Sequence, residues 1–70
     1  MEEIKRKSFF YTIIEGEMVD HYIKVNAENE EIAYSFAEHL LKDYKFTLSR
    51  REPSENHIGT LVQYRKDFYI

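Results

Sequence analysis

Residues 9–14 (FFYTII) form an apolar run with no polar side. Five of the six side chains are large and apolar or aromatic, and all six residues have high β-propensity. The run predicts a strand over residues 7–15 that lies inside a sheet and needs cover on both faces. The rest of the chain offers one helix, which covers one face only. What covers the other face is therefore the main question about function.

Residues 18–25 alternate between the two faces of a second predicted strand. Val19, His21, Ile23 and Val25 take one side, and Asp20, Tyr22 and Lys24 take the other. Gly16 separates the two strands, and glycine adopts the positive φ that tight hairpin turns require. The two strands are therefore predicted to form a hairpin.

A helix is predicted over residues 27–43, directly after the hairpin. Asn26 is the expected N-cap, because its side-chain oxygen can accept a hydrogen bond from a first-turn N–H. Three glutamates at positions 28, 30 and 31 place negative charge at the positive end of the helix dipole. The apolar residues then recur at helical spacing: Ile32, Ala33, Phe36, Ala37, Leu40, Leu41 and Tyr44.

The last third of the chain predicts two more strands. Residues 45–51 alternate as a third strand, residues 52–56 are a turn-rich loop, and residues 57–64 form a fourth strand that can extend to residue 70. The expected fold is one α+β domain over residues 1–70, a four-stranded antiparallel ββαββ sheet with one helix on one face. Strand order 2-1-3-4 is favoured over 1-2-4-3, because it puts residues 9–14 in the interior.

The length of the turn at Gly16 decides which side chains of the first strand point outward. A two-residue turn leaves Phe9, Tyr11 and Ile13 on the uncovered face with Tyr22, whereas a three-residue loop turns positions 10, 12 and 14 outward instead. Either way the uncovered face carries large apolar side chains, and the fourth strand adds to them. The expected partner-binding residues are Phe9, Tyr11, Ile13, Tyr22 and Tyr64.

Three occupants of the uncovered face are considered. It can bind another protein or a second copy of the chain, residues 67–70 can fold back over it, or its rings can stack on nucleic-acid bases. Protein contact is favoured, because exposed apolar patches are interaction sites in general. No RNP-like glycine–aromatic motif is present, and the net charge of −3 argues against nucleic acid.

A basic rim is expected at one end of the sheet in strand order 2-1-3-4. Its members are Lys5, Arg6, Lys7, Arg50 and Arg51. Such a rim could hold phosphate or acidic side chains and orient a partner. The helix begins at the same end with its three glutamates, so a self-compensated mixture of charges is the favoured interpretation.

No pattern indicates catalysis, a cofactor or a metal. The chain has no cysteine, which removes disulfides and Cys-type metal sites. His21, His39 and His57 fall on different predicted elements, with no nucleophile placed to act with them. A chain of 70 residues also offers little volume for a catalytic pocket. We therefore expect a protein that is not an enzyme and that uses no cofactor and no metal.

Size and composition favour a soluble cytoplasmic protein that associates with others. No apolar run approaches the ~20 residues of a membrane span, so no membrane partner is expected. Residues 1–4 lack the basic and apolar regions of a signal peptide. A domain of this size buries only about 60% of the surface that its unfolded chain exposes, and without cysteine, oligomerisation is the remaining common supplement.

The function that these patterns favour is a small non-enzymatic protein-interaction module that presents an aromatic sheet face and self-associates as a homo-oligomer. An adaptor, a regulator or an inhibitor, including one carried by a mobile element, fits this description. The alternative is a nucleic-acid-binding domain that stacks bases on the same aromatic side chains and holds phosphates at the basic rim.

Overall fold

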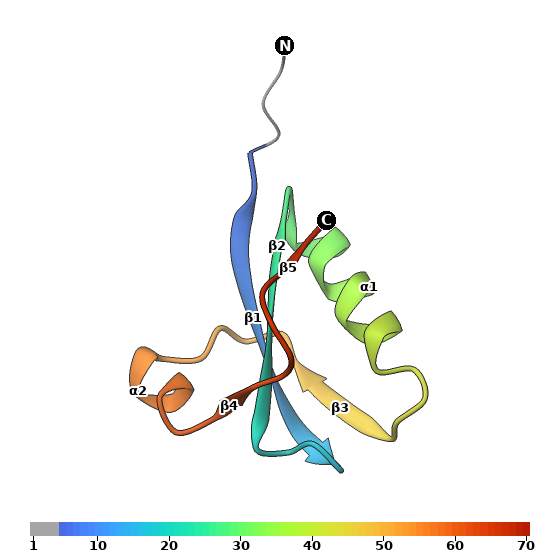
Figure 1. The fold of residues 1–70 in the computed structure, drawn as a ribbon, viewed down its shortest axis with the longest axis vertical. Helices are drawn as coiled ribbons and strands as arrows, with labels where there is room; N and C mark the ends of the chain where they lie inside the picture. The colour runs from blue at the N-terminus through green and yellow to red at the C-terminus, as the bar shows by residue number, and fades with distance from the viewer. Residues whose placement is uncertain (1–4) are drawn as a thin grey trace.

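The computed structural model describes residues 5–70 as an α+β fold (Figure 1), and the expectation about residues 1–4 lies outside that range. The elements are β1 (Lys7–Gly16), β2 (His21–Ala27), α1 (Glu30–Leu40), β3 (Phe46–Ser49), α2 (Glu55–Ile58), β4 (Val62–Gln63) and β5 (Phe68–Tyr69). The sheet order is β3-β1-β2-β4, and β5 also pairs with β2. The predicted α+β class is confirmed, but the sheet has five strands and is mixed rather than purely antiparallel.

β1 and β2 form the predicted hairpin, and β1 pairs antiparallel with β3 on its other side. The predicted neighbours 2-1-3 are therefore correct. Gly16 is not the turn itself: it ends β1 and lies opposite Phe46 of β3. Residues 17–20 make the turn, and the backbone N–H of His21 closes it by donating to the carbonyl of Met18 at 3.0 Å.

Because β4 covers just two of its residues, the predicted fourth strand over residues 57–64 is only partly correct. Its first residues belong to α2, where the Ser54 side chain accepts a hydrogen bond from the backbone N–H of His57. α1 and α2 lie on opposite sides of the β1–β2 hairpin (Figure 1), and after α2 the chain returns to β2 and not to β3. β4 and β5 then pair parallel with successive parts of β2.

The helix α1 begins later than predicted, because Asn29 and not Asn26 is its N-cap. The Asn29 side chain accepts a hydrogen bond from the backbone N–H of Ile32 at 2.9 Å. Asn26 is instead a buried residue of β2. Its side chain accepts from Ser8 Oγ at 2.7 Å and donates to the Phe68 carbonyl at 3.1 Å, so it connects β1, β2 and β5.

The core lies between α1 and the face of the sheet toward it, which we call the helix face. Tyr11 lies opposite Ile23, and Phe9 lies opposite Val25, so the odd-numbered residues of β1 up to Ile13 point to the helix face. This is the outcome that the three-residue-loop alternative predicted. The even-numbered residues of the paired stretch point to the opposite face, which we call the far face. The buried hydrophobic residues are Tyr11, Ile13, Ile23, Val25, Ala27, Ala33, Ala37, Leu41, Leu48 and Tyr64.

Candidate interaction site at the open edge of β1

Three of the predicted partner-binding side chains are buried in the core. Tyr11 and Ile13 are each 1% exposed, and Tyr64 is 6% exposed. Phe9 is half-buried against the core, and only Tyr22 lies on the far face, where it is also half-buried. The two-residue-turn alternative, which exposes positions 9, 11 and 13, is therefore wrong, because the strand register turns them toward α1.

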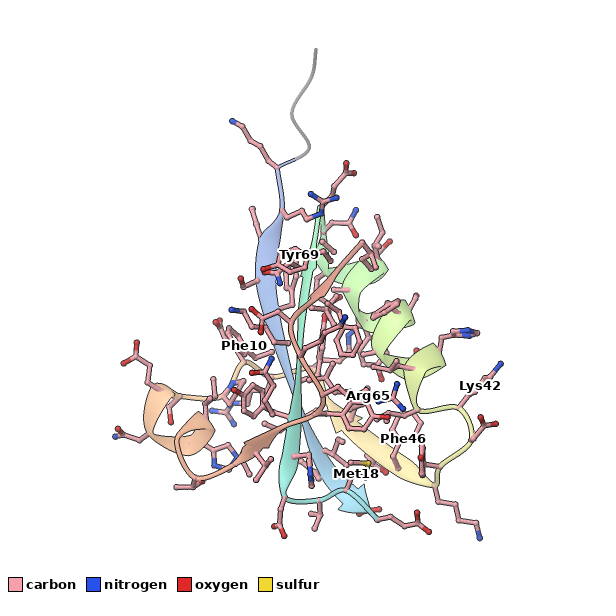
Figure 2. The ribbon with its side chains drawn as sticks, in the orientation of Figure 1. Phe10, Met18, Lys42, Phe46, Arg65 and Tyr69 are labelled. Atoms are coloured by element: carbon pink, nitrogen blue, oxygen red, sulfur yellow. The ribbon has the colours of Figure 1, made fainter. Side chains whose placement is uncertain are left out.

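The far face carries a small aromatic group. The rings of Phe10 and Tyr22 have centroids 6.1 Å apart. Tyr69 is 66% exposed, and Figure 2 shows it with Phe10 on the side of the hairpin away from α1. Within residues 67–70, β5 pairs with the edge of β2, and Asp67 just before it forms an ion pair with Lys24 at 3.1 Å.

Arg50, a member of the predicted basic rim, is neutralised by Glu30. The Arg50 Nε donates to Glu30 Oε1 at 2.8 Å, and a second bond joins Nη2 to Oε2. Because Arg50 donates to it, the pKa of the Glu30 carboxyl lies below its usual value. The Arg50 guanidinium also lies 4.1 Å from the ring centroid of Tyr34. At Arg50 the structure therefore shows the self-compensated mixture of charges that the sequence favours.

The other four rim residues do not converge on one anion site. Arg6 Nε donates to the backbone carbonyl of Ile70 at 3.0 Å. Lys5, Lys7 and Arg51 are exposed and form no ion pair within residues 5–70. Of these four, only Lys7 lies in the same pocket as Arg50.

β1 has an open edge over residues 7–11. β1 pairs with β2 from Lys7 to Thr12, but its pairing with β3 begins only at Thr12, which lies opposite Ser49. After Ser49 the chain leaves the sheet. In the part of the chain that the structure describes, no strand lies against residues 7–11 on that side.

The backbone groups of Ser8 and Phe10 point to this open edge. In β2, the carbonyls of Tyr22 and Asn26 accept hydrogen bonds from the segments on the β4–β5 side, so its even-numbered residues face away from β1. The odd-numbered residues of β2 therefore bond to β1, where they lie opposite positions 7, 9 and 11. Both backbone groups of a strand residue point to the same side, so Ser8 and Phe10 present N–H and C=O away from β2.

A pocket of about 290 Å³ lies along the open edge. It is lined by residues 7–11 of β1, by Glu30 at the start of α1, and by Arg50 and Glu52 after β3. The side chains of Phe9 and Phe10 are half-buried and lie on opposite faces of the sheet. The site therefore combines unpaired backbone groups, two aromatic rings and charged groups of both signs.

Sequence reasoning missed Ser8 and Glu52 as members of a site, and it included Phe10 only in the three-residue-loop alternative. One signal was present, since the third predicted strand, residues 45–51, is shorter than the first, residues 7–15. A short neighbour leaves part of a long strand unpaired. In the structure the difference is larger, because β3 has 4 residues and β1 has 10.

Tyr11 lies at one end of the open edge, and its hydroxyl donates to the backbone carbonyl of Glu30 at 3.3 Å. Burial, and then the negative charge of Glu30, raises the pKa of Tyr11 to about 12.

We expect the stability that Tyr11 contributes to be lost at high pH. The phenol ionises near pH 10 in the unfolded chain but only at about pH 12 in the folded chain. The contribution is thus complete below pH 10 and falls by roughly 2–3 kcal/mol as the pH rises from 10 to 12. Urea denaturation at about pH 9 and pH 11.5 should show a larger loss for the wild type than for Tyr11→Phe. Equal losses would contradict this assignment.

The described residues contain no cluster of His, Cys, Asp or Glu that could hold a metal ion. The histidines are apart, with His21 on β2, His39 on α1 and His57 on α2. The Nδ1 atom of His21 is buried and has no hydrogen-bond partner within residues 5–70. In the same range, neither helix has the length and apolar composition that crossing a membrane requires.

Comparisons of the chain with models of protein families, with curated proteins and with solved structures found no match.

Proposed function

We propose that this protein is a small non-enzymatic interaction module that binds an extended segment of another polypeptide along the open edge of β1. One observation carries the proposal: Ser8 and Phe10 direct their backbone groups into a pocket where no described strand pairs with them. Strand addition at an exposed sheet edge is a general mode of peptide recognition. Main-chain hydrogen bonds give affinity, and alternate side chains give specificity.

The side chains around the edge suit an added strand. Phe9 on the helix face and Phe10 on the far face can each pack against alternate side chains of the ligand, because neighbouring strands bring such pairs into contact. Lys7 and Glu52 are exposed at the pocket and can pair with charged side chains of either sign. The ligand is therefore an extended segment with apolar residues in its centre.

The same geometry gives little support to the alternative of nucleic-acid binding. Tyr11 and Tyr64 are buried and cannot stack on bases, and the Arg50 guanidinium is already engaged by Glu30. The pocket also gives no support to catalysis, since Ser8 Oγ donates to the Asn26 side chain and not to a general base. We therefore place the module among adaptors, regulators or inhibitors, and in the cytoplasm, which suits a chain without cysteine.

Ser8→Pro is expected to weaken the binding of an extended peptide by roughly tenfold, relative to Ser8→Ala. Proline removes the backbone N–H that an added strand would use, and this N–H faces away from β2, so the β1–β2 ladder is kept. Both variants lose the hydroxyl that bonds to Asn26, so they differ in the backbone N–H and in the φ angle that the proline ring restricts. The probes are peptides of about nine residues selected from a random displayed library on the immobilised wild type, with affinity measured by fluorescence polarisation.

Three results would overturn the proposal. The library could yield no binder, the selected peptides could bind Ser8→Pro and Ser8→Ala equally well, or the bound peptide could shift the NMR resonances of Tyr22 and Tyr69 on the far face and leave those of residues 7–11 unchanged. Circular dichroism of both variants confirms that each is folded before its affinity is compared.

A further inference from the structure

We infer that the strand which occupies the open edge is residues 7–11 of a second copy of this chain, paired antiparallel about a two-fold axis at Phe9. The inference rests on the proposed function, because it uses the same edge and names the occupant. Two features of the edge carry it: the alternation of its backbone groups and the opposite charge of its two ends.

The backbone alternation matches self-pairing in this register. With the axis at Phe9, Ser8 of each copy lies opposite Phe10 of the other. These are the residues whose N–H and C=O face the open edge, and in an antiparallel pair such residues exchange both hydrogen bonds. The Phe9 residues of the two copies then form the non-hydrogen-bonded pair at the axis, where side chains approach most closely.

The two ends of the edge carry opposite charge. Lys7 is at one end, with Lys5 and Arg6 before it. At the Tyr11 end, Glu30 and Arg50 neutralise each other, which leaves Glu52 as the acidic group of the pocket. Antiparallel pairing brings Lys7 of each copy opposite Tyr11 of the other, at the end of the pocket that carries Glu52, so unlike charges meet at both ends. Parallel pairing would instead place the two basic ends together.

The length of the edge limits the size of the dimer interface. Beyond Tyr11, β1 is already paired with β3, so only residues 7–11 are free to pair. An interface of one short strand pair is small and therefore weak. The dimer joins the two sheets into one continuous sheet with both copies of α1 on the same face, because the two-fold axis is perpendicular to the sheet.

Charge reversal at the two ends tests the inference by sedimentation equilibrium, up to roughly 1 mM protein because the interface is weak. Lys7→Glu and Glu52→Lys should each raise the dimer dissociation constant by roughly tenfold, since every copy then meets a like charge. The double variant should return it to near the wild-type value. Lys42→Glu is the matched control: Lys42 lies after α1 and projects away from β1 (Figure 2), and its reversal makes the same change in net charge.

The outcomes separate this inference from the proposed function. A wild type that stays monomeric at the highest concentration overturns self-pairing, and the proposed function stands if the selected peptides still distinguish Ser8→Pro from Ser8→Ala. A double variant that dimerises no better than the single variants overturns the antiparallel register. A Lys42→Glu effect as large as that of Lys7→Glu shows that net charge alone governs association, which also overturns the inference.

Discussion

Gly16→Ala is expected to lower the free energy of unfolding by roughly 3 kcal/mol or more. Gly16 has φ 115°, which L side chains rarely adopt. A Cβ atom there would lie 2.1 Å from the backbone carbonyl oxygen of Lys45 and 3.0 Å from Phe46 Cα, so the β1–β3 pairing would have to separate. A chain of this size has a total stability of about 4–10 kcal/mol, so the loss is a large part of it.

Gly59→Ala is the matched control for that substitution. Gly59 has φ −62° at the C-terminal end of α2, and its nearest neighbour would be 3.4 Å from an added Cβ, which is an ordinary contact. We expect it to be neutral or to stabilise by about 0.4–1 kcal/mol. Urea denaturation of both variants measures the difference. Equal stability of the two variants would show that Gly16 does not hold β1 against β3.

Asn26→Ala is expected to lower the free energy of unfolding by roughly 2–3 kcal/mol. The substitution removes the hydrogen bond from Ser8 Oγ and the one to the Phe68 carbonyl, and it leaves that carbonyl without its partner. Because Asn26 connects β5 to β2, the backbone N–H of Ile70, which donates to the Asn26 carbonyl at 3.0 Å, should also exchange faster with solvent.

Asn29→Ala is the control, because it removes the same type of side chain three positions later in the chain. It removes only the cap of α1 and should cost about 1 kcal/mol, with no effect on the exchange of the Ile70 amide. Denaturation and amide exchange of the two variants together test the assignment. If Asn26→Ala costs no more than Asn29→Ala, and the Ile70 amide stays protected, Asn26 does not hold β5.

Local patterns predicted the first half of the fold well. The alternation in residues 18–25 and the helical spacing from Ile32 depend on the burial of one face, which is visible in the sequence itself. The sequence places the N-cap three residues too early because Asn26 and Asn29 have the same local chemistry. What separates them is the bond from Asn26 to Phe68, a contact between residues far apart in the chain.

The C-terminal third could not be predicted in the same way. β4 and β5 have 2 residues each, which is too short for alternation to show. Their parallel pairing with β2 depends on the chain passing to the other side of the hairpin through α2 (Figure 1), and no local pattern specifies that path. Pairing of the last strand with β3 is the simpler topology. In the structure, β4 and β5 pair with the edge of β2 instead.

The open edge of β1 also depends on contacts between residues that are far apart in the chain. The turn at residues 17–20 sends Tyr11 and Ile13 to the core, so the far face carries Phe10 in their place, beside Tyr22. The early end of β3 at Ser49 then leaves residues 7–11 unpaired. The strand expected to need cover on both faces lacks a neighbour along part of one edge, so the candidate site combines free backbone groups with the side chains around them.

Amide hydrogen exchange measures whether Ser8 and Phe10 offer free backbone groups to an added strand. The measurement uses protein dilute enough to be monomeric, with and without the selected peptide. Without the peptide, the Ser8 and Phe10 amides should exchange faster than those of Phe9 and Tyr11, which face β2. With the peptide, the Ser8 and Phe10 amides should become protected. Equal exchange at all four positions in the free protein, or protection that appears elsewhere on binding, would contradict the account.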